Sequence, residues 1–139
     1  MSSNAEDTAS RVDRMDRGLA VRRRILGDAY VDAALDAPDS FSAPFQRFIT
    51  ENVWAGVWDR GVLDERSRSL VTMSILATNG HWHEFALHVG GALRNGFLTP
   101  EELFEVCAQL AAYAGYPVAL RATKEARPIV VEFLEENKS

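Results

Sequence analysis

The stretch 64-DERSRSLVTMSILATNGHWHEFALHVGGALRNG-96 contains two helical patterns separated by a short turn. Asp64 is a favourable N-cap residue, and apolar side chains follow it at helical spacing until the break at 79-NG-80. The second pattern covers about residues 81–95 and is closed by Gly96. Because a short turn joins antiparallel helices, the stretch predicts an antiparallel helical hairpin at the core of the fold.

Helical patterns continue on both sides of this hairpin, and no alternating strand pattern persists. In 99-TPEE-102, Thr99 is a typical N-cap, Pro100 suits the first helical position, and Glu102 completes a capping box. The sequence therefore predicts an all-α, compact multi-helix domain with about six to seven helices. The further helices are expected over residues 12–26, 28–36 (before Pro38), 42–56, 100–114 and 118–135. We expect a disordered tail over 1–10 and a single domain over 11–139.

Two of these helices carry apolar side chains that are expected to be buried. The helix over 42–56 presents Phe45, Phe48, Ile49, Val53 and Trp54 as a stripe. The helix from residue 100 presents Leu103, Val106, Leu110 and Tyr113 on one face, where the lone cysteine, Cys107, is a small core residue. Trp58 and Trp82 are expected to serve packing or an interface between subunits.

Composition restricts the possible functions. The 139 residues carry a formal net charge of −5, which argues against a nucleic-acid partner because phosphate binding needs clustered positive charge. No window is apolar enough to span a bilayer, and the N-terminal residues lack a secretory signal, so we expect a cytoplasmic protein without a membrane partner. Arg22, Arg23 and Arg24 would fan around a helix, so at least one should point inward or toward another subunit.

All three histidines lie within eight residues of the hairpin's second helix. His81, Glu84 and His88 share one face of it, whereas His83 falls on the opposite side. The cluster can be a solvent-exposed face with a weak Glu84–His88 pair, a metal site, or an acid/base site. A tight metal site would need a third strong ligand from elsewhere and no other histidine exists, so we expect no metal and favour acid/base chemistry.

Arg68 begins the helix that precedes the histidine cluster. An arginine in this position can simply pair with Asp64 or Glu65 at the surface. It can also bind a carboxylate next to the cluster, because its helix packs against the cluster helix in the predicted hairpin. Both interpretations remain open at this point.

The sequence resembles the carboxymuconolactone decarboxylase family in five stretches: 18-GLAVRRRILGD-28, 57-VWDRGVLDERSRSLVTMSILA-77, 84-EFALHVGGALRNG-96, 99-TPEELFEV-106 and 112-AYAGYPVAL-120. The resemblance implies a helical fold shared with alkylhydroperoxidase D proteins and assembly as trimers or hexamers. Those peroxidases carry a Cys-x-x-Cys pair at the positions of His81 and Glu84, so thiol peroxidase chemistry is not available here. Decarboxylases of this type often carry an arginine at the position of Gly90.

The resemblance also implies decarboxylation of a small carboxylated lactone in aromatic catabolism, without metal or organic cofactor. Under this hypothesis His81 or His88 delivers a proton and Glu84 orients it. Arg68, with Arg22 or Arg23, anchors carboxylates, and His83 is a further candidate for substrate binding. The alternatives are a related decarboxylase or isomerase of another carboxylated lactone or keto acid, and a non-catalytic oligomeric helical protein.

The expected assembly is a homo-oligomer, a trimer or a hexamer. Besides the resemblance, Trp54 and Trp58 favour an oligomer, because a chain this short has a limited core in which to bury both rings. The arginines at 22–24 also need acceptors in more than one direction.

Overall fold

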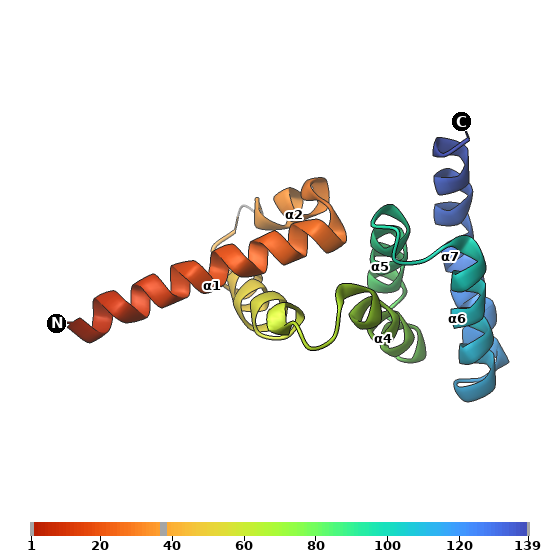
Figure 1. The fold of residues 1–139 in the computed structure, drawn as a ribbon, viewed down its shortest axis with the longest axis horizontal. Coiled ribbons are helices and arrows are strands. Elements are labelled where there is room, and N and C mark those ends of the chain that lie inside the picture. The colour runs from red at the N-terminus through yellow and green to blue at the C-terminus, as the bar shows by residue number, and fades with distance from the viewer. Residues whose placement is uncertain (1, 37–38, 139) are drawn as a thin grey trace. The chain divides into compact units, whose positions relative to one another are not determined.

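The computed structural model describes residues 2–36 and 39–138, and these residues form seven α-helices and no strand (Figure 1). The all-α class and the number of helices are therefore confirmed. The chain divides into two compact units, which we call the N-terminal unit (residues 1–63) and the C-terminal unit (residues 64–139). The expectation of one domain over 11–139 stays a prediction.

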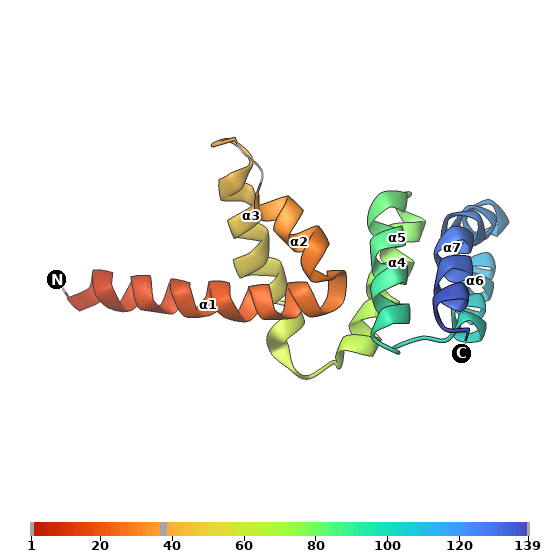
Figure 2. The ribbon, with the colours of Figure 1, turned by 90° about the horizontal axis from the view of Figure 1, so that it is seen from above.

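The N-terminal unit is built around α1 (Ser2–Leu26), which packs against α2 (Asp28–Leu35) and the π-helix η1 (Thr50–Ala55). Helix α3 (Ala43–Ile49) leads directly into η1, and a 3-10 turn, η2 (Trp58–Arg60), closes the unit (Figure 2). Gly27 takes a φ of 89°, which only glycine adopts easily, and so separates α1 from α2 at the predicted residue.

Helix α1 includes residues 2–10, for which the sequence predicted a disordered tail. The side chains of residues 3–10 are exposed, so no core holds this part of the helix. Residues 2–10 continue the part of α1 that packs against the rest of the unit. An ion pair of 3.7 Å between Arg11 and Asp7 stabilises the helix weakly. Helix α2 ends at Leu35, and Pro38 lies outside the described residues.

The predicted apolar stripe of the third helix is wrong for most of its members. Phe45, Phe48 and Val53 are exposed, whereas Trp54 is buried. The face toward the interior instead follows the half-buried Gln46 and the buried Thr50 and Trp54, which are spaced four residues apart. Arg22 of α1 donates hydrogen bonds to the first two of these side chains, so α1 covers this polar face.

Trp54 and Trp58 were expected to be hard to bury in one chain. Both are buried, at 5% and 6% exposure, and their rings stack with centroids 5.1 Å apart. These two residues therefore no longer support an oligomer.

The C-terminal unit contains α4 (Glu65–Thr78), α5 (Trp82–Arg94), α6 (Pro100–Tyr113) and α7 (Tyr116–Glu136). The predicted hairpin corresponds to α4 and α5, which pack against each other. Asp64 caps α4 by accepting a hydrogen bond of 2.7 Å from the Ser67 amide, and Gly80, at a φ of 74°, makes the turn. Both features agree with the sequence prediction.

All four helices contribute to one apolar core. Its fully buried members include Met73 and Ala77 of α4, Phe85 and Val89 of α5, and Ala122 of α7. Helix α6 adds Leu103, Val106 and Leu110 as predicted, and Cys107 is buried beside them. Tyr113, the fourth residue of that predicted face, is 85% exposed.

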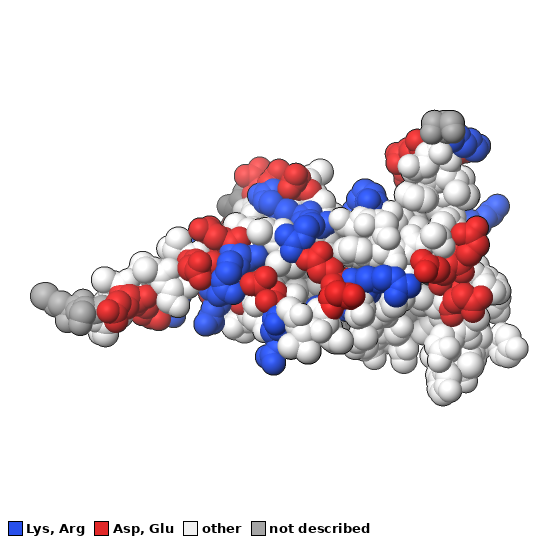
Figure 3. All heavy atoms as spheres, viewed as in Figure 1, with Lys and Arg blue, Asp and Glu red and all other residues white. Residues whose placement is uncertain are grey.

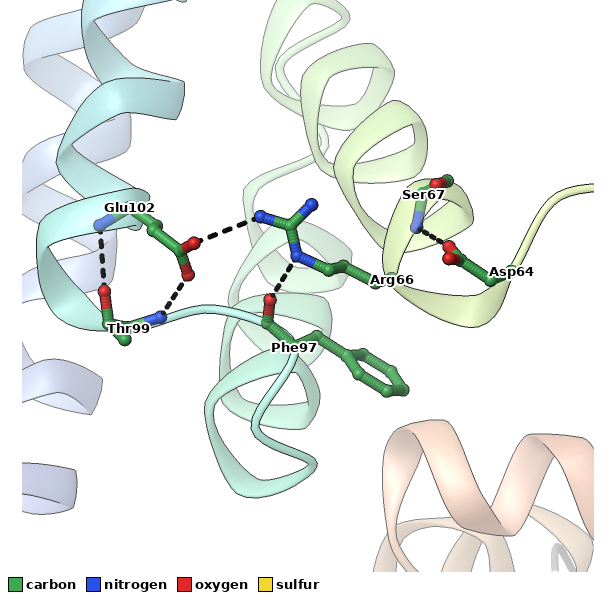
Figure 4. A network of polar contacts seen from close by, with 6 residues as sticks. All are labelled: Asp64, Arg66, Ser67, Phe97, Thr99 and Glu102. Carbon is green, nitrogen blue, oxygen red and sulfur yellow. Dashed lines mark hydrogen bonds and ion pairs between the residues drawn. The ribbon is translucent and has the colours of Figure 1, made fainter.

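A polar network fixes the α5–α6 connection to the beginning of α4 (Figure 4). The Thr99 hydroxyl accepts from the Glu102 amide at 3.2 Å, and the Glu102 carboxylate accepts from the Thr99 amide at 2.9 Å, so the predicted capping box is present. Arg66 donates 2.8 Å to the Phe97 carbonyl and 3.2 Å to the same carboxylate. The hydrogen bond from the Thr99 amide is the largest cause of a lowered pKa of Glu102, and the charge and hydrogen bond of Arg66 lower this pKa further.

On the face drawn in Figure 3, acidic and basic side chains are interspersed along α1. Within the part of the chain that the structure describes, every helix is too short or too polar to cross a membrane.

Candidate active site

The histidine cluster occupies the first two turns of α5. His81 is the N-cap residue, and its amide donates 2.9 Å to the Leu76 carbonyl at the end of α4. Its side chain makes no capping bond and is exposed, as is Glu84 in the first turn. The turn between α4 and α5 thus leaves two ionisable groups at the surface of the C-terminal unit.

His88 lies one turn further along α5 and is 8% exposed. Phe85, three residues before it, and Val89, directly after it, are fully buried in the core. Burial lowers the pKa of His88 to about 4, while the negative charge of Glu84 acts in the opposite direction. The imidazole is therefore neutral near pH 7, with a carboxylate close enough to affect it.

The predicted face of the cluster is thus split by burial: His81 and Glu84 are exposed and His88 is buried. His83 is exposed as well. Among the described residues, no three histidine, cysteine, aspartate or glutamate side chains are placed to hold one metal ion. A buried neutral imidazole beside an exposed carboxylate can donate or accept a hydrogen bond in an acid/base step.

Arg68 lies in the first turns of α4 and is half-buried. Its Nε is buried and has no hydrogen-bond partner. The carboxylate of Asp64, which the sequence offered as a surface partner for Arg68, instead caps α4. A buried guanidinium donor without a partner is costly, and a carboxylate ligand would satisfy it.

The other two candidate arginines lie in the N-terminal unit. Arg22 is 4% exposed, and its guanidinium donates 3.1 Å to the Thr50 hydroxyl and 2.8 Å to the Gln46 amide oxygen. Arg23 forms ion pairs of 3.4 Å with Asp28 and 2.8 Å with Asp32. The prediction that one of these arginines points inward is confirmed, and that residue is Arg22.

Two further arginines, one on α7 and one at the end of α5, were not among the site residues predicted from the sequence. The Arg121 guanidinium of α7 lies 5.6 Å from the Trp82 ring centroid, and Trp82 packs edge-on against Phe85. Arg94 brings its Nη1 to within 3.0 Å of the place where a side chain on Gly90 would begin. A guanidinium group therefore lies beside Gly90. The contact of Arg121 with Trp82 has no signal in local spacing, whereas Gly90 and Arg94 are four residues apart on the same helix.

Comparison with known proteins shows the class of enzyme to which this helical chain belongs. The profile of the carboxymuconolactone decarboxylase family matches residues 43–128, a segment that includes the cluster and Arg68, and the chain belongs to this family. It is accordingly a carboxy-lyase.

Individual relatives differ in their named substrates. The chain is 38% identical over 122 residues to a nitrosuccinic acid decarboxylase of Metarhizium robertsii, which covers 88% of this chain and 85% of that protein. It is 34% identical over 116 residues to the 4-carboxymuconolactone decarboxylase of Acinetobacter baylyi, covering 84% and 86%. A 4-carboxymuconolactone decarboxylase of Pseudomonas putida is 46% identical over 39 residues, which is 28% of this chain and 81% of that protein.

Proposed function

We propose that this chain decarboxylates a small dicarboxylate without a metal or an organic cofactor. The observation that carries the proposal is the buried His88 beside Glu84, in a chain of the carboxymuconolactone decarboxylase family. Arg68, whose buried Nε has no partner, supplies the positive charge that an anionic substrate needs.

The two named substrates share a chemical frame that defines the proposed substrate class. In nitrosuccinic acid, one carbon carries a carboxylate, a carboxymethyl arm and a nitro group. In 4-carboxymuconolactone, the γ carbon of the ring carries a carboxylate, a carboxymethyl arm and a double bond conjugated to the lactone carbonyl. The common element is a succinate whose second carbon bears an electron-accepting group.

The same step follows for both compounds. The bond from that carbon to its carboxylate breaks, carbon dioxide leaves, and the electron pair moves into the nitro group or through the ring double bond to the carbonyl oxygen of the lactone. A proton is then added to the carbon that bears the nitro group, or to the α carbon of the lactone ring. This step restores the neutral nitro group or the neutral lactone. Because the substrate accepts its own electron pair, the protein has only to bind, stabilise the developing negative charge and supply the proton.

The residues suggest a division of these roles. Neutral His88 donates a hydrogen bond to the oxygen that becomes negative, and Glu84 orients it. The exposed His81 delivers the proton. Arg68 binds the carboxymethyl carboxylate, and the exposed His83 is a further candidate for substrate binding.

Arg22 and Arg23 are less suited to substrate binding than Arg68, because their guanidinium groups already bind side chains of the N-terminal unit.

Arg68→Lys should raise KM roughly 10-fold or more with little change in melting temperature, since a bidentate contact is lost. Arg22→Lys should lower the melting temperature instead. If Arg22→Lys raises KM at unchanged stability, Arg22 is a substrate anchor after all.

Within this class, we propose conversion of 4-carboxymuconolactone to β-ketoadipate enol-lactone in protocatechuate catabolism, in the cytoplasm, as the function. Nitrosuccinic acid is the second candidate, favoured by the 38% identity. We further propose a homo-oligomer, a trimer or a hexamer. Carbon dioxide release by the purified protein from each compound, compared with release from succinate, tests the proposed substrate class. The ratio of the two kcat/KM values shows which compound is the better substrate.

A further inference from the structure

The hydroxyl of Thr72, in the middle of α4, forms no hydrogen bond with any residue that the structure describes. A helical threonine can either donate to a carbonyl of the preceding turn or turn its hydroxyl away from the backbone. The Thr99 hydroxyl caps α6. The remaining threonine hydroxyls donate at 2.7–2.9 Å to the carbonyl group four residues earlier: Thr8, Thr50, Thr78 and Thr123. Thr72 thus differs from them and keeps its O–H donor available for a ligand.

Arg68, one turn earlier on α4, also leaves its hydrogen-bonding capacity unused. Its guanidinium forms no ion pair within residues 2–36 and 39–138, and its Nε is buried without a hydrogen-bond partner. Side chains four residues apart are neighbours on the surface of a helix. A carboxylate has two oxygens that each accept hydrogen bonds, so a single carboxylate can bind Arg68 and Thr72 at once.

Helical geometry places both residues on the side of α4 that is turned away from α6. Met73 is fully buried and marks the centre of the core-facing side. Ser74, directly after it, lines a hollow together with Val106 of α6. Because a helix turns by about 100° per residue, the residue before Met73 lies on the other side of the buried face. That residue is Thr72, and Arg68 lies beyond it.

Helix α5 shows the same division. Trp82 contacts Arg121 of α7, so this side of α5 is turned toward α7. Glu84 and His88 lie on the other side of the fully buried Phe85. Helices α4 and α5 pack side by side (Figure 2). The sides that are turned away from α6 and α7 therefore meet on one side of the hairpin.

The turn between the two helices sets which residues lie level. It is closed by the hydrogen bond from the amide of residue 81 to the carbonyl of residue 76. Counted from this bond, Thr72 lies one turn into α4, at the level of Glu84 on α5. Arg68 lies two turns in, at the level of His88. The spare donors of α4 are therefore beside the acid/base residues of the candidate active site.

We propose that Thr72 is a substrate-binding residue, which holds the carboxymethyl carboxylate together with Arg68. The inference rests on the proposed function and deepens it. The Thr72 hydroxyl donates to one carboxylate oxygen, and the Arg68 guanidinium donates to the other. Hydrogen bonds to a charged carboxylate are roughly twice as strong as those to a neutral group. The pair therefore selects substrates whose arm ends in a free carboxylate rather than in an ester or an amide.

Succinate tests the carboxylate site without the reaction, because it has the carboxymethyl arm but no electron acceptor. Its Kd is measured by calorimetry on the full-length chain. Thr72→Val keeps the shape of the side chain but removes the hydroxyl, so it should raise this Kd roughly 10-fold or more, the size expected for a hydrogen bond to a charged group. Thr72→Ser keeps the hydroxyl and should bind as the wild type does.

Two further variants show whether the effect belongs to this site. Thr78→Val is the matched control on the same helix, because the Thr78 hydroxyl already donates 2.8 Å to the Ser74 carbonyl; it should leave the Kd unchanged. In the double variant Thr72→Val, Arg68→Lys, the two losses of affinity should not add fully, since both side chains bind one carboxylate.

The assignment is overturned by a wild type that does not bind succinate, by an unchanged Kd in Thr72→Val, by an equal loss in Thr78→Val, or by a serine variant as weak as the valine variant. Carbon dioxide release from the activated compounds is measured separately. If succinate binds as expected but neither activated compound reacts, the carboxylate site stands and the proposed function fails. If they react and Thr72→Val keeps the wild-type kcat/KM, the chemistry stands and the role of Thr72 is refuted.

Discussion

The free energy of unfolding should depend on pH through His88. Its folded pKa is about 4, below the unfolded value near 6.5, so the neutral imidazole is favoured by folding. As the pH falls from 6.5 toward 4, the unfolded chain gains a proton that the folded chain does not, and stability is lost. Between pH 7 and pH 5 this linkage amounts to about 2 kcal/mol.

Urea unfolding of the wild type and of His88→Gln at both pH values measures the effect. The variant should lose about 2 kcal/mol less stability than the wild type between pH 7 and pH 5, because glutamine does not titrate. His83→Gln is the matched control and should keep the wild-type dependence, since His83 is exposed. An identical pH dependence in all three proteins would mean that His88 is not buried as neutral imidazole.

Glu84→Gln should lower kcat by roughly 10²-fold, the size expected when an acid/base group is lost. Glu84 is exposed, so the melting temperature should stay within a degree or two. Glu101→Gln, an exposed carboxylate in the first turn of α6, is the control and should keep full activity. A Glu84→Gln variant that unfolds while keeping its turnover per folded molecule would make the carboxylate structural.

At the residue level, sequence reasoning could find which side chains share a face of α5, because helical spacing decides that. It could not tell that His88 is buried and Glu84 exposed, since burial depends on the packing of several helices. The Arg121 contact with Trp82 joins residues 39 positions apart and has no local signal.

At the scale of elements, the N-terminal unit depends on a close approach of α1 to η1. A side chain on Gly18 would collide with the backbone carbonyl of Thr50. Because backbone cannot give way as a side chain can, Gly18→Ala should destabilise the protein by about 1–3 kcal/mol. Alanine would otherwise favour the helix.

Chemical denaturation measures this change. Ser10→Ala, at an exposed position of the same helix, should alter stability by no more than about 0.5 kcal/mol and is the control. If Gly18→Ala is neutral or stabilising, α1 and η1 are not in close contact at this position.

Elements defined by local chemistry were predictable. Asp64, Gly80 and the Thr99–Glu102 capping box set helix boundaries through contacts within a few residues. The exposed Phe45 and Phe48 were not predictable, because a helix with two apolar faces does not reveal which one its neighbour covers. Here the buried Arg22 selects the face with Gln46 and Thr50.

At the scale of the whole molecule, decarboxylation should be unaffected by metal chelation. The proposed substrates accept their own electron pair, and so no Lewis acid is needed. Protein dialysed against EDTA should keep its kcat, and elemental analysis should find less than one metal ion per chain. Activity that is lost on dialysis and restored by one particular metal would refute cofactor-free chemistry.

The central claim is that this chain removes carbon dioxide from a succinate whose second carbon bears an electron acceptor. The most direct measurement is carbon dioxide release by purified wild type and Glu84→Gln from 4-carboxymuconolactone, nitrosuccinic acid and unsubstituted succinate. The account predicts release by the wild type from at least one of the first two compounds, roughly 10²-fold less by the variant, and none from succinate. Absence of release from both activated compounds, or equal rates for the wild type and the variant, would contradict it.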